Sequence, residues 1–283
     1  MSQRPAADGE RLAADGERLA ADGERVAIRL DEHIAVVTLT RPDKHNALDL
    51  AMLDAIIAAA ERLRGEAGVR AVVLHGAGKS FCSGLDFPAV AAAGGLEAFM
   101  GILDEPSPNY FQRAGHGWID LPVPVIAAIH GNCLGGGLQI ALAADIRIAA
   151  PDARLSVMEG RWGLIPDMSI TRTLPRLVGI DVAKELTITA RTIDAAEADR
   201  LGLITHLDDD PLTAAIELAR EIAERSPDAV RRAKRLFNDG WTGSADQTLA
   251  LEAELQGELI GTPNQLAAMT AAMTKQAAQF TDP

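Results

Sequence analysis

The sequence predicts an α/β fold that ends in a helical region. Two observations support this prediction. Short β-like runs alternate with helix-like stretches over roughly the first half of the chain, and nearly every pattern after Asp181 is helical. Such alternation is typical of a sheet covered by helices, and a run of helices after it indicates a further subdomain. With 283 residues, 48% of them hydrophobic, the chain can bury a core without disulfide or metal staples.

The predicted elements follow in chain order. Residues 25–30 and 34–40 are β-like runs around a polar turn, which indicates a hairpin. Asp49 precedes an apolar-periodic stretch at 50–63, which indicates a helix with its cap. The remaining expected elements are strands at 71–75, 122–130, 145–149 and 203–207, a helix at 134–144, and a partly helical connection over 88–117.

The N-terminus contains a repeat. Residues 6–26 repeat a seven-residue unit, which suggests a coiled coil, but each unit has a single apolar position and a glycine. A coiled-coil seam needs two apolar positions, and glycine weakens a helix by about 1 kcal/mol. We therefore expect a disordered tail at 1–25, an α/β core at 26–205 and a helical C-terminal region at 206–283.

Composition limits the partners. Lys and Arg total 27 against 40 Asp and Glu, a formal net charge of −13, which argues against nucleic acid or an anionic membrane but not against a small anion. The basic run at 231–235 fits a solvated helix face. No signal peptide or membrane-length apolar run occurs, so we expect a cytoplasmic protein with no membrane partner. Cys82, Cys133 and the histidines show no ligand spacing, which predicts reduced thiols and no metal site.

Two glycine-bearing turns follow predicted strands, at 81–86 and 130–139. Such turns let a ligand approach the backbone, and unpaired N–H groups of a first helical turn point toward it. Two turns side by side could direct two N–H donors at one oxygen, as an oxyanion hole does. The alternative is that the glycines only allow tight packing of helix on strand. Neither turn has the pattern of a phosphate loop.

Two acids stand among apolar residues. Glu159 and Asp167 are the only acids between Asp152 and Asp181, and their neighbours are largely hydrophobic. Carboxyl groups in apolar surroundings have raised pKa values and can transfer protons near neutral pH. The alternative is that both are exposed loop acids, or that Asp167 caps a helix.

Taken together, these segments resemble the enoyl-CoA hydratase/isomerase (crotonase) superfamily from about Val26 to the C-terminus. The resemblance rests on the order and spacing of six motifs. The motifs lie at 41–48 (Arg-Pro-Asp-Lys-His-Asn-Ala-Leu), 81–86 (Phe-Cys-Ser-Gly-Leu-Asp), 124–137 (ending Leu-Gly-Gly-Gly), 144–149, 174–179 and 279–282.

The resemblance implies a crotonase fold of repeated β-β-α units whose C-terminal helices build a trimer, often paired into a hexamer. It implies an acyl-CoA thioester substrate, with coenzyme A as part of the substrate and no separate cofactor. By motif position, the backbone N–H groups of Leu85 and Gly136 would hold the thioester oxygen.

The resemblance also assigns binding residues. Lys44 could pair with a coenzyme A phosphate or be a solvated lysine, and Asn46 and Ala47 would shape the loop near the adenine. Lys275 and Phe280 would approach the nucleotide end, sometimes of a neighbouring subunit. Further positions expected at the substrate are Ser83, Gly84, Asp86, Gly135, Gln139 and Trp162, the last in the acyl pocket or in the core.

The acids distinguish between reactions. Hydratases of this superfamily use two glutamates, and this chain matches the second with Glu159 but has Gln139 at the first. An amide cannot act as a base at neutral pH, although it could orient water. Asp167 resembles an acid of the dienoyl-CoA isomerases, which usually carry aspartate where Gln139 stands.

Our leading hypothesis from the sequence is therefore an acyl-CoA double-bond isomerase of the dienoyl-CoA type, with Glu159 and Asp167 transferring protons. One alternative is an enoyl-CoA hydratase that uses Glu159, with Gln139 positioning water. The other is an acyl-CoA binding protein without catalytic activity.

Overall fold

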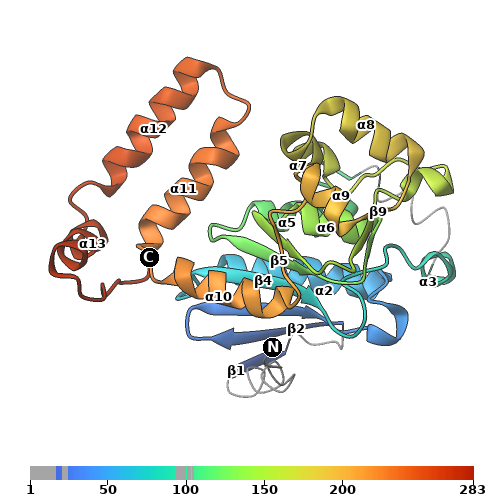
Figure 1. The fold of residues 1–283 in the computed structure, drawn as a ribbon, viewed down its shortest axis with the longest axis horizontal. Coiled ribbons are helices and arrows are strands. Elements are labelled where there is room, and N and C mark those ends of the chain that lie inside the picture. The colour runs from blue at the N-terminus through green and yellow to red at the C-terminus, as the bar shows by residue number, and fades with distance from the viewer. Residues whose placement is uncertain (1–16, 21–24, 94–99, 101–102, 104) are drawn as a thin grey trace, which may run out of the picture.

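The computed structural model describes every residue except 1–16, 21–24, 94–99, 101–102 and 104. Among the described residues, two sheets form the centre of the body (Figure 1). The larger sheet has the order β1-β2-β3-β4-β5-β7-β10, and the smaller has the order β6-β8-β9. The strands of the larger sheet are β1 (Glu17–Ala20), β2 (Val26–Asp31), β3 (Ile34–Leu39), β4 (Ala71–Gly76), β5 (Val125–Ile129), β7 (Ile146–Ala149) and β10 (His206–Leu207).

Hydrophobic pattern and register explain the larger sheet. β2 and β3 pair antiparallel as the predicted hairpin, and every pairing from β3 to β10 is parallel. β4 and β5 are almost continuously buried, as expected for parallel strands with both faces covered. One face packs on α2 (Leu50–Arg64), and the other packs on α10 (Pro211–Ala223) through residues such as Ile216.

Short helices and the smaller sheet surround the glycine turns. The strands of the smaller sheet are β6 (Asn132–Leu134), β8 (Arg154–Ser156) and β9 (Ile193–Asp194). The helices around them are α3 (Phe87–Ala92), α5 (Tyr110–Ile119), α6 (Gly136–Leu142), η2 (Glu159–Trp162), α7 (Ile170–Leu177), α8 (Ile180–Thr189) and α9 (Ala195–Arg200). The predicted helix at 134–144 therefore begins two residues late, because residues 132–134 extend along β8 instead.

The expectation of an unstructured tail at 1–25 is wrong for four residues. Glu17–Ala20 pairs antiparallel with β2, with Glu17 opposite Leu30. The other repeat residues of the tail, 6–16 and 21–24, lie outside the described residues.

The boundary expected at residue 206 is also misplaced. β10 pairs with β7 at the edge of the large sheet, and α10 packs on β4 and β5. The segment that leaves the body begins only at α11 (Pro227–Gly240) and continues through α12 (Ala245–Leu259) and α13 (Pro263–Thr274). These three helices form an arm that projects from the body (Figure 1).

The sequence suggested that the basic run at 231–235 is a solvated helix face, but one of its residues is buried. The Lys234 residue is 9% exposed, and its ammonium lies 2.8 Å from a carboxylate oxygen of Asp145. None of the described helices is long and apolar enough to cross a membrane.

Candidate active site

The two glycine turns lie side by side because backbone hydrogen bonds join them. The Cys82 N–H donates to the carbonyl oxygen of Asn132 at 3.0 Å, and the Leu134 N–H donates to that of Cys82, also at 3.0 Å. Gly84 has φ +89°, and a Cβ there would lie 2.9 Å from the Leu134 carbonyl oxygen. This position therefore admits only glycine, which makes the close approach of the two turns possible.

The first turn leaves the Leu85 N–H without an acceptor. Leu48 pairs beside Leu85 as an isolated bridge, in which the Leu48 N–H donates to Gly84 and the Asp86 N–H donates to Leu48. These two bonds engage the Gly84 carbonyl oxygen and the Asp86 N–H, and neither of them involves the Leu85 N–H. Within the described part of the chain it has no hydrogen-bond partner.

The second turn leaves a similar donor. Gly136 is the first residue of α6, and the first N–H groups of a helix have no acceptor inside it. Its N–H has no partner among the residues that the structure describes. A Cβ on Gly136 would lie 2.8 Å from both Leu48 Cδ1 and Met168 Sδ, so a larger residue would displace these two side chains.

Leu85 and Gly136 both line one cavity of about 330 Å³, and the same cavity is lined by Glu159 and Asp167. The structure thus brings together the four residues that the sequence singled out for chemistry. Ser83, Gly84, Gly135 and Trp162 also line the cavity. Its apolar wall includes Leu48, Phe87, Phe111, Met158, Leu164, Ile165 and Met168.

Glu159 begins η2, just beyond β8, and its two carboxylate oxygens are in different situations. Oε1 accepts a hydrogen bond of 2.7 Å from Nε2 of Gln139. Oε2 is buried and has no hydrogen-bond partner among the described residues. Burial raises the pKa of Glu159 above its ordinary value, and the nearby Asp167 carboxylate adds to this, whereas the bond from Gln139 opposes it.

Asp167 is half-buried on the segment between η2 and α7, and burial raises the pKa of its carboxyl group as well. It does not cap α7, which begins at Ile170 with Ser169 at its N-cap position. Two carboxyl groups with raised pKa values in one apolar cavity can exchange protons with a ligand near neutral pH.

The expectation that Gln139 positions water, or touches substrate, is wrong. Its residue is 1% exposed and does not line the cavity. One end of the amide holds Glu159, and the other accepts the Met168 N–H at 2.8 Å. Both ends of the side chain are therefore engaged within the protein.

Asp86 is also a structural residue rather than a ligand contact. Its carboxylate accepts the Ala89 N–H as the N-cap of α3 and forms an ion pair of 2.8 Å with Arg41. Trp162, in contrast, is not in the core: it is 59% exposed and packs against Phe87 with 4.6 Å between ring centroids. It forms part of the cavity wall.

The early loop, residues 41–48, meets the cavity only through Leu48. The Asn46 side chain is fully buried and its amide nitrogen donates to the carbonyl oxygens of Ser80 and Phe81, so it shapes the loop and cannot contact a ligand. Lys44 is exposed at the end of η1 (Pro42–Lys44), and Ala47 is half-buried. The Ser83 hydroxyl, on the cavity wall, donates to the Lys44 carbonyl oxygen at 3.4 Å.

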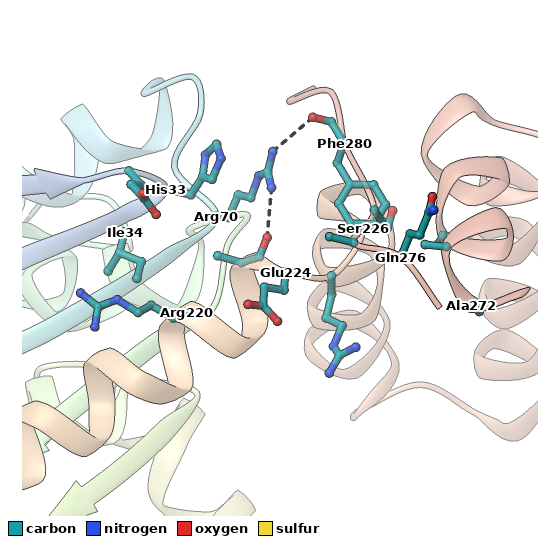
Figure 2. Close-up of a pocket in the computed structure, with 16 residues that line it drawn as sticks. His33, Ile34, Arg70, Arg220, Glu224, Ser226, Ala272, Gln276 and Phe280 are labelled. Atoms are coloured by element: carbon teal, nitrogen blue, oxygen red, sulfur yellow. Dashed lines mark hydrogen bonds between the residues drawn. The ribbon is translucent and has the colours of Figure 1, made fainter. Parts of the chain in front are cut away.

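Phe280 lies in a different cleft of about 630 Å³, between the end of α10 and α13 (Figure 2). Arg70 holds this C-terminal segment: its guanidinium donates to the Phe280 carbonyl oxygen at 3.4 Å and to the Asp282 carboxylate at 2.6 Å. Lys275 is an exposed residue that ends α13. Neither residue lines the Glu159 cavity of its own chain, and their approach to the nucleotide end of the substrate stays a prediction. A contribution to a neighbouring subunit stays a prediction.

Sequence reasoning missed the role of Met168, whose N–H anchors Gln139, and it missed the wall residues Phe87 and Phe111. Phe87 and Phe111 come from segments distant from the two acids in the chain, and no local pattern marks them. Among the described residues, no group of three or more His, Cys, Asp or Glu side chains could hold a metal ion.

The fold is the crotonase fold. A solved enoyl-CoA hydratase from Bacillus anthracis matches it with a TM-score of 0.85 and 33% identity, covering 91% of this chain and 99% of the other. The chain belongs to the enoyl-CoA hydratase/isomerase family, whose sequence model matches residues 29–283.

Curated relatives agree with this family. A short-chain-enoyl-CoA hydratase from Clostridium acetobutylicum is 38% identical over 247 residues, which cover 86% of this chain and 92% of the relative. A mitochondrial methylglutaconyl-CoA hydratase from Mus musculus is 33% identical over 254 residues, with coverages of 87% and 79%.

Proposed function

We propose that this protein is an acyl-CoA double-bond isomerase of the dienoyl-CoA type. The observation that carries the proposal is one cavity lined by two acids, Glu159 and Asp167, and by Leu85 and Gly136, whose N–H groups have no partner in the described part of the chain. Family membership supports an acyl-CoA thioester as the ligand.

The two donors would bind the thioester carbonyl oxygen. Removal of a proton from the acyl chain moves negative charge onto that oxygen, because the resulting carbanion is an enolate. Preorganised donors that face the oxygen stabilise this charge, and loss of one such donor typically costs about 2.7–4 kcal/mol. The apolar wall around them strengthens the interaction by excluding water.

The two acids would exchange protons at different carbons. One carboxylate removes a proton from the acyl chain, the double bonds shift through the enolate, and the other carboxyl group delivers a proton to a second carbon. Substrate and product then have the same composition, and each acid ends in the opposite protonation state from its start. The raised pKa values of both groups suit this exchange near neutral pH.

The early loop would hold the coenzyme A part of the substrate. Lys44 is exposed next to Ser83 on the cavity wall, where an ammonium group could meet a phosphate, and Ala47 lies in the same loop. We expect turnover without an added cofactor or metal ion. An assay of activity after treatment with a chelator tests this expectation.

The test is a panel of enoyl-CoA and dienoyl-CoA esters assayed with the wild type, Glu159→Gln and Asp167→Asn. We expect each substitution to lower kcat for isomerisation by about 10²–10⁴-fold, with Asp209→Asn, an exposed acid outside the cavity, as the matched control. Undiminished isomerisation by Asp167→Asn would exclude the two-acid mechanism.

Hydration of an enoyl-CoA is the second candidate, because the relatives and the solved structure described above are named hydratases. Gln139 cannot orient the water in this structure, so Glu159 and Asp167 would have to do so. Rapid formation of a 3-hydroxyacyl-CoA from a short enoyl-CoA by the wild type would favour hydration. Calorimetric binding of acyl-CoA with no turnover of any ester would instead favour a non-catalytic binding protein.

We also propose assembly into a homotrimer or a dimer of trimers. Large apolar side chains are exposed on the arm, among them Phe237 at 69%, Trp241 at 58% and Met273 at 76%. Exposed apolar surface of this kind indicates a protein interface. Analytical ultracentrifugation distinguishes a trimer from a hexamer and from a monomer.

A further inference from the structure

Gln139 is a buried polar side chain that touches both segments carrying the acids. It projects from α6, the helix that begins at Gly136, and reaches Glu159 of η2 and the backbone at Met168. Buried amides are held by hydrogen bonds at both ends, and leaving either end unpaired is costly. Its position between the two acids therefore calls for a specific explanation.

The orientation of this amide follows from its partners. The Met168 N–H can only donate, so the atom of Gln139 that faces it, at 2.8 Å, must be the carbonyl oxygen. The amide nitrogen therefore faces Glu159 and donates to Oε1 at 2.7 Å. The two carboxylate oxygens therefore differ in their surroundings: Oε1 is held by Gln139, and Oε2 is buried without a hydrogen-bond partner in the described part of the protein.

We propose that Gln139 is a positioning residue that fixes the Glu159 carboxylate through Oε1. The same amide binds the Met168 N–H, directly after Asp167, and so sets the separation of the two acids. This inference rests on the proposed function for its kinetic consequences, but the fixed carboxylate can be tested without any substrate.

The backbone of Gly135 also packs close to the Glu159 carboxylate. Gly135 lies against the carboxylate, where a Cβ would stand 3.4 Å from Oε1 of Glu159. Gln139 itself does not line the cavity, so it acts through Glu159 and Met168 rather than on a ligand. A loss of Gln139 should therefore change kcat while KM stays nearly constant.

The first experiment compares the wild type with Gln139→Met and Gln139→Glu. Methionine fills similar space but removes both hydrogen bonds, so the carboxylate loses a donor that favours its ionised form. Glutamate can still accept the Met168 N–H, but it places a second carboxyl group against Oε1, so the pair must share a proton. Infrared titration of the Glu159 carboxyl, isolated by subtracting Glu159→Gln, follows protonation in the free enzyme.

We expect the Glu159 titration to move to higher pH in Gln139→Met and further still in Gln139→Glu. In Gln139→Met, kcat should fall by about 100-fold, as expected for a misplaced catalytic group. Ser169→Ala is the matched control, because the Ser169 hydroxyl holds the same segment to the Gln112 carbonyl oxygen without touching Glu159. That control should leave the titration unchanged.

Two results separate failure of this inference from failure of the proposed function. An unchanged Glu159 titration in both Gln139 variants would overturn the positioning role, whatever the kinetics show. A shifted titration in an enzyme that isomerises no ester would retain the positioning role and reject the isomerase. If Gln139→Met does not fold, the titration of Gln139→Glu alone decides, because that variant keeps the bond to Met168.

Discussion

Replacing Lys234 with methionine should destabilise the fold, because this lysine ties the arm to the body from a buried position. Its side chain is 5% exposed, and its ammonium donates to the carbonyl oxygens of Trp118 at 3.2 Å and Val123 at 3.0 Å. The Asp145 carboxylate is the third partner, at 2.8 Å. Methionine retains most of the apolar stem and removes all three interactions.

The magnitude follows from what the substitution leaves behind. Removal of one partner of a buried ion pair costs about 3–5 kcal/mol, because the other charge stays buried without compensation. Asp145 keeps 27% exposure and still accepts the Val125 N–H at 2.7 Å, so the lower end, about 3 kcal/mol, applies. At about 2–4 °C per kcal/mol for a chain of this class, Tm should fall by about 6–12 °C.

Urea unfolding and calorimetry measure this loss. Arg235→Met is the control on the same helix: its ion pairs with Asp239 and Glu254 are exposed, so we expect a change of at most about 1 kcal/mol. The double variant with Asp145→Asn should lose less than the sum of the two single changes. A loss below about 1 kcal/mol in Lys234→Met would refute the buried-pair argument.

Three further outcomes are expected. Gly136→Ala should weaken acyl-CoA binding in calorimetry, since the added carbon would meet the ends of the Leu48 and Met168 side chains at 2.8 Å and displace these two residues of the cavity wall; unchanged affinity contradicts this. Cys82 and Cys133 should resist thiol reagents until the protein unfolds, because burial raises the pKa of Cys82 to about 12 and that of Cys133 well above its ordinary value; labelling of the folded protein would count against it. Asp167→Asn should be more stable than the wild type at pH 7. The raised pKa means that the folded state binds more protons than the unfolded state, so wild-type stability falls as pH rises above the ordinary value of 3.8. Urea titrations at pH 3.5 and pH 7 should therefore show the difference only at the higher pH.

The early part of the fold was predictable because its signals are local. The hairpin of β2 and β3 follows from alternating residues around a short turn, and the N-cap of α2 follows from Asp49, whose carboxylate accepts the Met52 N–H at 2.8 Å. The short strands β6 and β8 were missed, because three residues carry no readable period and pair only through tertiary contact.

The charged and polar residues show most clearly what could not be predicted from the sequence. Lys234 belongs to a basic run that looks solvent-facing in the sequence, yet the packing of α11 on the body buries it beside Asp145. Asp86 and Asn46 sit inside functional-looking motifs but bond to the protein itself. Nothing in a linear sequence distinguishes a polar group with a protein partner from one that awaits a ligand.

The sequence by itself determined the family, the two glycine turns and the two acids, because these depend on residue type and order along the chain. Only the tertiary structure decided that Glu159 and Asp167 share one cavity with the Leu85 and Gly136 donors. It alone decided that Gln139 binds Glu159 and the Met168 N–H. The physical reason is that partnership and burial, which set pKa values and leave donors free, arise from contacts between segments distant in the chain.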